Sequence, residues 1–422
     1  MAVSLDRSEV ARRSSLAQIT LEVHRNGAIS RAELAKNVGF SLTHICRIVD
    51  DLLLQGELVE TSTVTGTRGR PKVMLEINPD GAPMAGVRLG PDEAEIAVAD
   101  SSGRIVGRNS VPYDCDSEPP DEMIGSIARG IHRCAKTAGK DPNALRGVGV
   151  AVAGLADPML GVLDGLTNRR GWEGVPVARM LEQEMGVPVH VDNDVRAGAL
   201  GDQWLANDAS PGGALYIIIS DGIGAAVVQN REVLRGAHDT AGLLGHTTID
   251  PNGPLCGCGK RGCLEALTAD VAFIKSIWPD LTKTTSQMSV SERTSLVKRG
   301  VGLAVQGHTI ASAALVAVTT YLGIGIANAV CMYDPCTVLI SGTLVDISPD
   351  LVADMIRREA VKNIWPRTKG VEIRPFMHWQ EFMVKGAIAL VQWERYRTLQ
   401  DNANATATRS YARDDGDRVG GR

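Results

Sequence analysis

One short stretch of the chain carries a histidine and three cysteines at a spacing that suits a metal ion. His246, Cys256, Cys258 and Cys263 follow the pattern H-x9-C-x-C-x4-C. One neutral imidazole and three thiolates form the closed tetrahedral sites that hold structural Zn²⁺, and the intervening glycines allow a tight loop around the ion. With all four positions filled by protein, no activated water remains for hydrolysis, so we expect a structural zinc. The alternative is a group of buried thiols without a metal.

The residues around this pattern resemble a family signature. GAHDTAGLLGH, which ends at His246, and CGCGKRGCLEA, which begins at Cys256, are similar to the signature of the ROK family of bacterial sugar kinases and sugar-responsive transcriptional repressors. The resemblance runs from about Ala85 to Arg397. It implies a two-lobed α/β body with an actin-like, ribonuclease H-like fold. Because both branches of the family share that fold, individual residues must decide between them.

The resemblance also implies a sugar-binding cleft with a base. The pair Asn193-Asp194 matches the family's Asn-Asp, in which the Asp takes the proton from the attacking sugar hydroxyl. Asn168, His246 and Glu265 match family sugar contacts. We therefore expect these five residues to line an effector site, although each alone could be a capping or loop polar group.

Two loops that would hold a nucleotide depart from the kinase pattern. Where family kinases read Asp-x-Gly-Gly-Thr, this chain has Arg88, Pro91 and Asp92, so a cation replaces an acid and the proline offers no N–H to a phosphate. Asp221 stands where kinases usually carry Thr. A carboxylate ~4 Å from a phosphate oxygen costs about 4 kcal/mol at an effective dielectric of ~20. We therefore expect no enzyme activity, and Asp194 only as a vestigial base.

One sugar contact of the family is replaced as well. The Glu two residues before the Gly-His of the motif is Leu243 here. An apolar group at that point leaves a sugar hydroxyl unsatisfied, at roughly 1 to 3 kcal/mol. The ligand could therefore be a phosphorylated or amino sugar, or the cleft could bind no small molecule.

Residues 14 to 78 predict a separate unit that would position DNA-contacting side chains. A first apolar-periodic helix ends at Gly27, a second begins with the capping-box pair Ser30 and Glu33, and a third follows Ser41. The positions of the third helix that we expect to face the core are Leu42, Ile45, Cys46, Val49, Leu52 and Leu53. This leaves three side chains outward, namely Thr43, His44 and Arg47, as in the second helix of a helix-turn-helix.

The runs ELVETSTV and KVMLEI predict a β-hairpin whose connection, TGTRGRP, would be the wing of a winged helix. Arg68, Arg70 and Lys72 lie at or near its tip. Over residues 1 to 82, ten basic side chains are matched by ten acidic ones, so the case for DNA depends on their placement. The alternative is a small packing module with a solvated basic hairpin.

Composition limits the remaining classes. The 422 residues, 44% hydrophobic and 22% charged, are typical of a soluble protein with two or three domains, and a net charge of −5 excludes a general polyanion-binding field. Five of the eight cysteines are scattered singly, and no secretory-type leader precedes them, so we expect a cytoplasmic protein. The stretch Thr309 to Tyr333 carries no charge and is long enough to span a membrane, but its polar residues favour a buried helix.

The sequence after residue 83 contains a weak internal repeat. MAGVRLG, EIAVAD and GRIVGR near its start resemble ALYIIIS, GAAVVQ and REVLRG further on, which predicts two lobes that each begin with a hairpin. We expect a DNA-binding domain over residues 1–82 and a two-lobed domain over 83–398, with a lobe boundary near 200 and a C-terminal helix that returns to the first lobe. Residues 399–422 lack apolar periodicity and predict a disordered tail.

The sequence thus favours a transcriptional regulator that represses sugar-related genes. It would bind double-stranded operator DNA as a homodimer that could pair further into a tetramer, and a sugar or sugar phosphate would be its effector. Two alternatives stay open. One is an active ATP-dependent sugar kinase that carries a DNA-binding arm, and the other is a DNA-bound scaffold that senses no small molecule.

Overall fold

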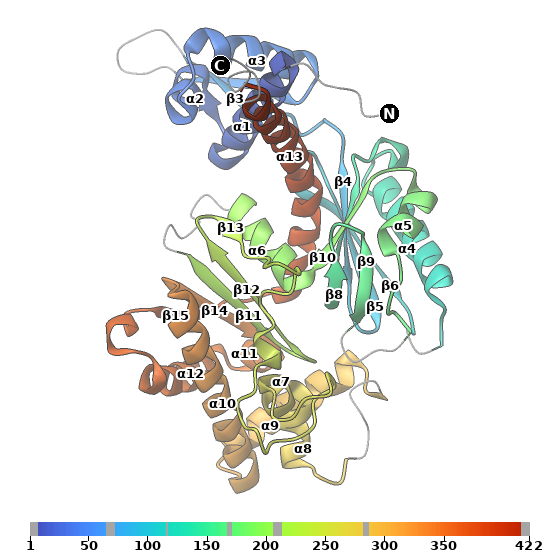
Figure 1. Cartoon of the computed structure of the whole chain (residues 1–422). Helices are drawn as coiled ribbons and strands as arrows, with labels where there is room; N and C mark the ends of the chain where they lie inside the picture. The colour runs from blue at the N-terminus through green and yellow to red at the C-terminus, as the bar shows by residue number, and fades with distance from the viewer. Residues whose placement is uncertain are drawn as a thin grey trace, which may run out of the picture.

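The computed structural model describes residues 7–64, 72–114, 117–166, 171–205, 213–281 and 287–414. Within these ranges the chain forms an N-terminal module and a body of two α/β lobes. One long C-terminal helix runs from the body to the module (Figure 1). The lobes face each other across a cleft, and the module lies at one end of the body (Figure 1).

The N-terminal module combines three helices with a small antiparallel sheet of order β1-β3-β2. Its elements are α1 (Arg7–Asn26), β1 (Ile29–Ser30), α2 (Arg31–Val38), α3 (Leu42–Leu54), β2 (Leu58–Val64) and β3 (Lys72–Ile77). The expected capping box is present, because the Ser30 side chain accepts from the Glu33 N–H and Glu33 accepts from the Ser30 N–H. Gly39 ends α2 in the left-handed region with φ 74°. The element order is that of a helix-turn-helix followed by a hairpin.

The inward face of α3 differs from the prediction at its start. Ile45, Val49 and Leu52 are buried, as expected, together with Ile48, which the prediction omitted. Leu42 was expected to face the core but is 52% exposed. It is the first residue of α3, so its side chain lies beyond the edge of the core that α1, α2 and α3 share.

Lobe 1 is built on a five-stranded sheet of order β10-β7-β4-β5-β6. Its elements are β4 (Met84–Leu89), β5 (Glu93–Ala99), β6 (Ile105–Pro112), α4 (Pro120–Thr137), η1 (Pro142–Ala144), β7 (Val148–Val152), β8 (Gly154–Asp157), β9 (Val162–Leu166), α5 (Val177–Met185) and β10 (Val189–Asn193). The first three strands pair antiparallel, and β7 and β10 then add on parallel. β8 and β9 form a separate hairpin beside the cleft.

Lobe 2 repeats this topology with the strand order β13-β12-β11-β14-β15. Its elements are α6 (Asp194–Leu205), β11 (Ala214–Ile219), β12 (Ile223–Gln229), β13 (Glu232–Val233), η2 (Leu244–His246), α7 (Leu264–Thr268), α8 (Asp270–Ile277), α9 (Val290–Val305), α10 (Thr309–Tyr333), β14 (Thr337–Gly342), α11 (Thr343–Ile347), α12 (Pro349–Asn363), η4 (Pro366–Thr368) and β15 (Glu372–Pro375). Three antiparallel strands are again followed by two parallel ones, which confirms the predicted duplication.

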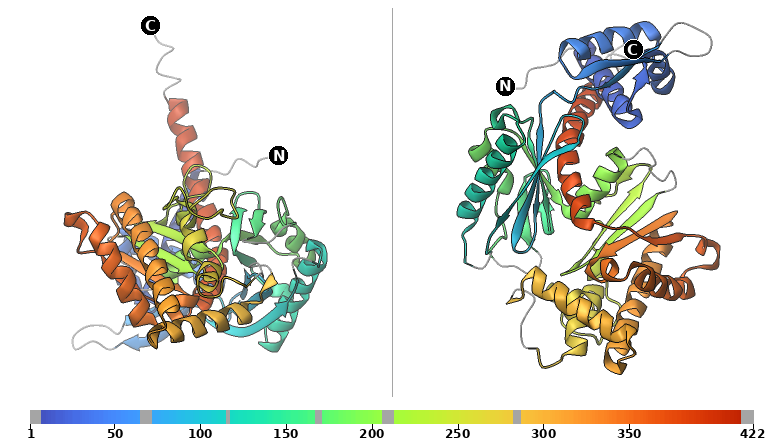
Figure 2. Two further views of the ribbon diagram at one scale, coloured as in Figure 1. Left: turned by 90° about the horizontal axis from the view of Figure 1, so that it is seen from below. Right: turned by 180° about the vertical axis from the view of Figure 1, so that it is seen from behind.

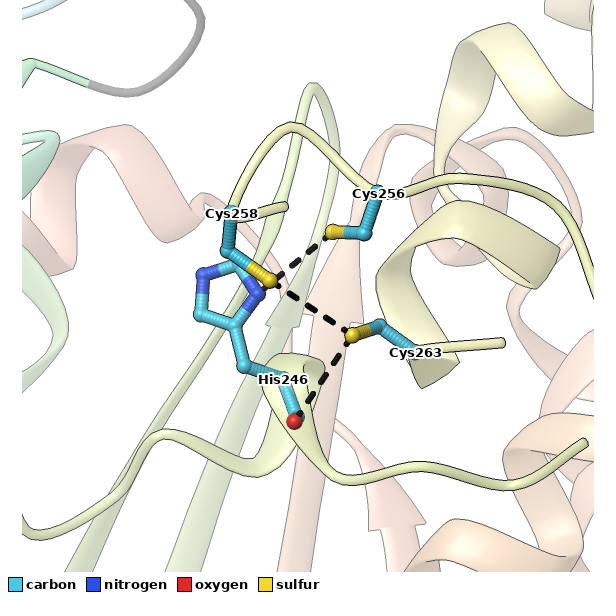
Figure 3. A group of neighbouring side chains, drawn as sticks. All are labelled: His246, Cys256, Cys258 and Cys263. Atoms are coloured by element: carbon cyan, nitrogen blue, oxygen red, sulfur yellow. Dashed lines mark hydrogen bonds between the residues drawn. The ribbon is translucent and has the colours of Figure 1, made fainter. Parts of the chain in front are cut away.

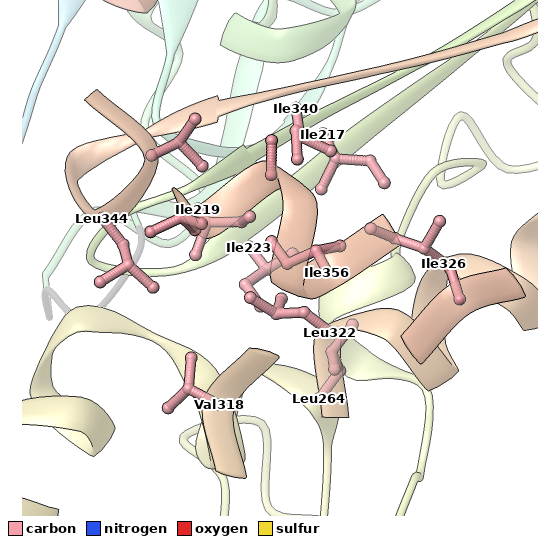
Figure 4. Close-up of a cluster of buried hydrophobic side chains, with 14 of the residues drawn as sticks. Ile217, Ile219, Ile223, Leu264, Val318, Leu322, Ile326, Ile340, Leu344 and Ile356 are labelled. Carbon is pink, nitrogen blue, oxygen red and sulfur yellow. The ribbon is translucent and has the colours of Figure 1, made fainter. Parts of the chain in front are cut away.

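The core of lobe 2 explains the uncharged stretch. Ile217 and Ile340 of the central strands meet Leu322 and Ile326 of α10 (Figure 4). Among the described residues, α10 is the one helix long and apolar enough to cross a membrane, yet more than half of its most apolar window is buried. This burial agrees with the predicted core helix.

The last helix, α13 (Trp379–Asp414), returns to lobe 1 and packs against β4, β7 and α6. Contact is so close that a Cβ at Gly149 of β7 would stand 1.7 Å from the Ala387 carbonyl oxygen of α13. Beyond the body the helix continues as far as Asp414 (Figure 2). These helical bounds overlap the stretch from residue 399 for which the sequence predicts a disordered tail, and that tail stays a prediction.

Candidate effector cleft, metal centre and DNA-contact helix

The four expected metal ligands come together. His246 ends the short turn η2, Cys256 and Cys258 lie in the following loop, and Cys263 caps α7 (Figure 3). One ligand atom from each lies within 4.8 Å of all the others, with 3.6 Å between the Cys258 and Cys263 sulfurs and 3.7 Å between Cys256 Sγ and His246 Nδ1. A tetrahedral zinc with Zn–S bonds of ~2.3 Å separates its sulfurs by roughly 3.8 Å. The donor set and its spacing therefore fit Zn²⁺.

The loop that carries these ligands depends on one glycine. Gly262 has φ 64°, and a Cβ there would stand 1.4 Å from the Asp250 carbonyl oxygen. Only glycine combines that φ with so close an approach. Backbone bonds close the loop, since the Cys256 N–H donates to Lys260 O at 2.7 Å and the Gly262 N–H to Pro254 O at 2.8 Å. The ligand positions are thus fixed by the backbone.

A cleft of about 1180 Å³ separates the lobes, and both contribute to its walls. Asn193 and Asp194 come from lobe 1 and the start of α6, and His246 and Glu265 come from lobe 2. Four of the five expected effector residues therefore share one cavity. The fifth, Asn168, lies outside the described residues.

Asp194 is the least solvated of these groups. It is 6% exposed at the first turn of α6, and this burial raises its pKa to about 6, against a smaller opposite effect of the Arg88 charge. Its Oδ1 accepts from the Val195 N–H at 2.8 Å. A carboxyl group with a pKa near neutrality can take up or hold a proton from a bound hydroxyl.

Asn193 holds the start of α6 in place. Its Oδ1 accepts from the N–H groups of Val195 and Arg196, both at 3.1 Å, and its Nδ2 donates to the Gly154 carbonyl at 3.0 Å. This side chain therefore orients Asp194 and joins it to the β8–β9 hairpin.

Glu265 connects the cleft with the metal loop. Its Oε2 accepts from the Ile223 N–H at 3.0 Å, and Cys256 Sγ lies 3.9 Å from its Oε1. His246 turns Nδ1 toward the sulfurs, so its other ring nitrogen is free of the cluster where the residue lines the cleft. Metal loop and cleft thus share His246 and are joined by Glu265.

The side chains of the first loop that departs from the kinase pattern are paired within the protein. Arg88, 5% exposed, donates to Glu95 at 2.6 Å and lies over the Trp379 ring at 4.9 Å. Asp92 accepts from the Val290 N–H of α9 at 3.0 Å, which bridges the two lobes.

The second loop differs from the expectation. We predicted that Asp221 would repel a phosphate, but its carboxylate already binds Arg293 at 2.5 Å. Arg293 is 1% exposed and also donates to the Met288 carbonyl at 2.6 Å. Behind this pair, burial and the Asp221 charge raise the pKa of Asp270 to about 7. The charge of Asp221 is therefore largely compensated, and the predicted repulsion was too large.

The DNA-contact residues of α3 divide into two kinds. Thr43 and Arg47 are exposed on its outer face. His44 is only half-exposed, because its Nε2 lies 3.1 Å from Ser15 Oγ of α1 and its ring meets Phe40 edge-on at 5.1 Å. The sequence predicts an outward His44, and in the structure this side chain is partly covered by α1 and Phe40.

Two of the three predicted wing residues, Arg68 and Arg70, lie outside the described residues. Lys72 begins β3 and donates to Glu33 of α2 at 2.9 Å. Both members of that pair are about half-exposed, so it contributes little stability. Sequence reasoning missed Arg293 and Trp379, since no local motif marks them and only the fold brings them to the cleft.

Comparison with known proteins assigns this architecture to a protein family. The sequence profile described as "ROK family" matches residues 84–394. The chain belongs to the ROK family. A relative called "Putative xylose repressor", from Caldicellulosiruptor sp. (strain Rt8B.4), is 30% identical over 347 residues, which are 81% of this chain and 86% of the relative.

Solved ROK structures share the fold. A ROK family transcriptional regulator, described as a homolog of the E. coli Mlc protein, superposes with a TM-score of 0.77 over 93% of this chain and 99% of its own, at 22% identity. The ROK hexokinase from Thermus thermophilus reaches a TM-score of 0.61 and 28% identity over 74% of this chain and 98% of its own. The regulator therefore matches the N-terminal module as well as the body.

Proposed function

We propose that this ROK protein is a DNA-binding transcriptional repressor of sugar-related genes. The observation that carries the proposal is the exposed outer face of α3, with Thr43 and Arg47, in a helix-turn-helix attached to a ROK body. These two side chains would reach base edges in the major groove, and Arg68 and Arg70 of the wing would enter an adjacent minor groove. Lys72 would contact a phosphate.

His44 receives a different role in this proposal. Its contacts with Ser15 and Phe40 suit a residue that orients α3 against α1 rather than one that reads a base. A homodimer would place two such helices on one face of an inverted repeat, and pairs of dimers could form a tetramer. We assign the protein to the cytoplasm, where operator DNA is found.

The kinase alternative has one observation in its favour, the buried Asp194 with a pKa near 6. Against it, the charged groups that would meet a nucleotide already form ion pairs within the protein. Arg88 binds Glu95, and Arg293 binds Asp221 deep in the second loop. Pro91 has no N–H to donate. Opening both ion pairs would leave buried charges uncompensated, so we infer that the phosphate loops are degraded and that the body senses a ligand.

We infer that His246, Cys256, Cys258 and Cys263 hold a structural zinc. Four protein donors close its coordination sphere, so the ion would fix the loop and supply no nucleophile. The effector would bind beside it, between Asn193, Asp194, His246 and Glu265, with Asn168 as a further contact. A sugar or sugar phosphate is the class that we propose, and the relative's name makes xylose the first to try.

Binding to promoter fragments tests the main proposal. Fluorescence anisotropy with fragments upstream of sugar-uptake and sugar-utilisation genes should give tight, salt-dependent binding to an inverted repeat, with a much weaker affinity for a scrambled sequence. Equal affinity for both sequences would refute the repressor assignment.

A coupled assay of ADP release distinguishes the kinase alternative from the proposed repressor. Hexoses, pentoses and amino sugars should each give no turnover above background with purified protein, and robust phosphoryl transfer would establish the enzyme instead. Calorimetry against the same panel tests the scaffold alternative, in which no sugar binds.

A further inference from the structure

An ion pair beside the cleft joins lobe 1 to lobe 2. Its arginine also contacts α13, the helix that supports the DNA-binding module. Arg235 follows β13 of lobe 2, and its Nη2 donates to Asp192 Oδ2 of lobe 1 at 2.7 Å. Asp192 is 1% exposed and lies next to Asn193-Asp194 of the cleft. Arg196 of α6 also binds Asp192, with Nε at 2.9 Å from its Oδ1.

The same arginine contacts α13. Its guanidinium lies over the Trp393 ring at 5.0 Å, and Arg397 lies over that ring at the same distance. Trp393 packs into an apolar cluster that holds α1 against the body. Its other members are Ala17 and Leu21 of α1, Ala151, Ala197, Leu200, Trp204, Val233, Ala387 and Leu390. Arg235 is therefore placed between the cleft and the first helix of the module.

A continuous segment leads from Arg235 into the effector site. Residues 239 to 243 line the cleft, and His246 of the metal cluster follows. Arg196 also donates to the Asp239 carbonyl, and Arg235 Nη1 lies 3.5 Å from the Asp239 carboxylate. A shift of this segment on ligand binding would thus act directly on the position of Arg235.

The module has a second attachment that Arg235 does not touch. Glu57, which follows α3, binds Arg146 of lobe 1 at 3.1 Å and Arg395 of α13 at 2.8 Å. Both partners of Glu57 belong to lobe 1 or to the helix packed on it. Two parts of lobe 2 reach α1. One is α6, whose first residues line the cleft, and the other is the segment of Val233 and Arg235, which leads into the cleft-lining residues 239 to 243.

From this arrangement we propose that Arg235 is the positioning residue that couples the effector cleft to the DNA-binding module, a proposal that rests on the repressor function above. In the arrangement described, Arg235 holds Asp192 of lobe 1 and Trp393 of α13 at once. When a ligand changes the separation of the lobes, Arg235 moves with lobe 2, and the support of α1 by Trp393 changes with it.

The variant Arg235→Ala tests the coupling with the full-length protein. The quantity to measure is the ratio of operator dissociation constants with and without saturating sugar, using D-xylose with D-glucose and N-acetylglucosamine in parallel. Wild-type protein should give a ratio of fivefold or more, the usual range for coupled sites. In the variant the ratio should fall to within twofold of one, while calorimetry shows sugar binding weakened by less than about tenfold.

Arg374→Ala is the matched control, since Arg374 pairs with Glu372 at an exposed edge of lobe 2 and should keep the wild-type ratio. Hydrogen exchange of α1 adds an independent readout and should accelerate in Arg235→Ala without sugar. The proposal is overturned if Arg235→Ala keeps the wild-type ratio, or if it loses the sugar itself. Failure of wild-type protein to bind any promoter fragment would instead refute the repressor function, and operator binding that no sugar alters would refute sensing and this coupling together.

Discussion

Replacing Asp194 by Asn should stabilise the protein at neutral pH, because the native fold holds this carboxylate away from water. The group is buried at the first turn of α6, and this burial raises its pKa to about 6 where 3.8 is usual. The difference of about 2 pH units corresponds to about 3 kcal/mol of unfolding free energy at 1.36 kcal/mol per unit. Asn keeps the acceptor for the Val195 N–H and removes the charge.

The sign of the pH dependence follows from the raised pKa. Above pH 6 the native state carries the buried charge and bears the full cost of about 3 kcal/mol. As the pH falls through 6 the native state takes up a proton before the unfolded chain does, so the cost shrinks and disappears below about 4. The advantage of Asp194→Asn should therefore be largest at pH 8, about half of that at pH 5, and about a fifth at pH 4.

Urea denaturation at these pH values measures the effect, with Asp350→Asn, an exposed acid of lobe 2, as the control. When the unfolding free energy of the wild type is subtracted from that of the variant at each pH, the contributions of all other titrating groups cancel. An unchanged urea midpoint at pH 8, or an advantage that grows as the pH falls, would show that Asp194 is solvated and would remove the argument for a functional carboxyl in the cleft. Gain in stability with loss of effector binding is the expected combination at a functional site.

Three further predictions concern the other sites. Arg47→Ala should lower the preference for operator over scrambled DNA by about 1 to 3 kcal/mol, while Arg70→Ala should weaken both to a similar extent, as measured by anisotropy titration; unchanged preference in the first variant would remove Arg47 from the reading helix. Cys258→Ser should lower the zinc content by elemental analysis and the thermal midpoint by several degrees, and a full zinc content would exclude this ligand. Arg293→Ala should destabilise the protein by about 3 kcal/mol, because Asp221 is left beside the buried Asp270 without its cation, and an unchanged thermal midpoint would contradict the pairing.

Local features of the chain could be predicted from the sequence. The capping box of Ser30 and Glu33 and the helix end at Gly39 depend on residues only a few positions apart, and both are present. The metal cluster spans 18 residues whose glycines force a tight loop, so its four ligands meet as expected. The repeated pattern likewise predicted two lobes that each begin with a β-hairpin, and the pairs β4–β5 and β11–β12 confirm it.

Features that depend on packing between distant segments could not be predicted. The partner of Asp221 is Arg293, which lies 72 positions away in a helix without any motif, so the charge of that loop was misjudged. His44 occupies an outward position by helical periodicity, but Ser15 and Phe40 cover one side of it. The role of Arg235 depends on Asp192 and Trp393, which come from two other parts of the chain.

The packing of α1 on α13 joins the first described helix of the chain to the last. During synthesis α1 leaves the ribosome hundreds of residues before Trp393 and Arg395 exist, so the module can fold early but cannot dock until translation is almost complete. A nascent or truncated chain that ends before Leu390 would present α3 to DNA without the support that connects it to the body. Such fragments are expected to occupy operators and ignore every sugar, which makes the integrity of the carboxyl terminus a condition for induction.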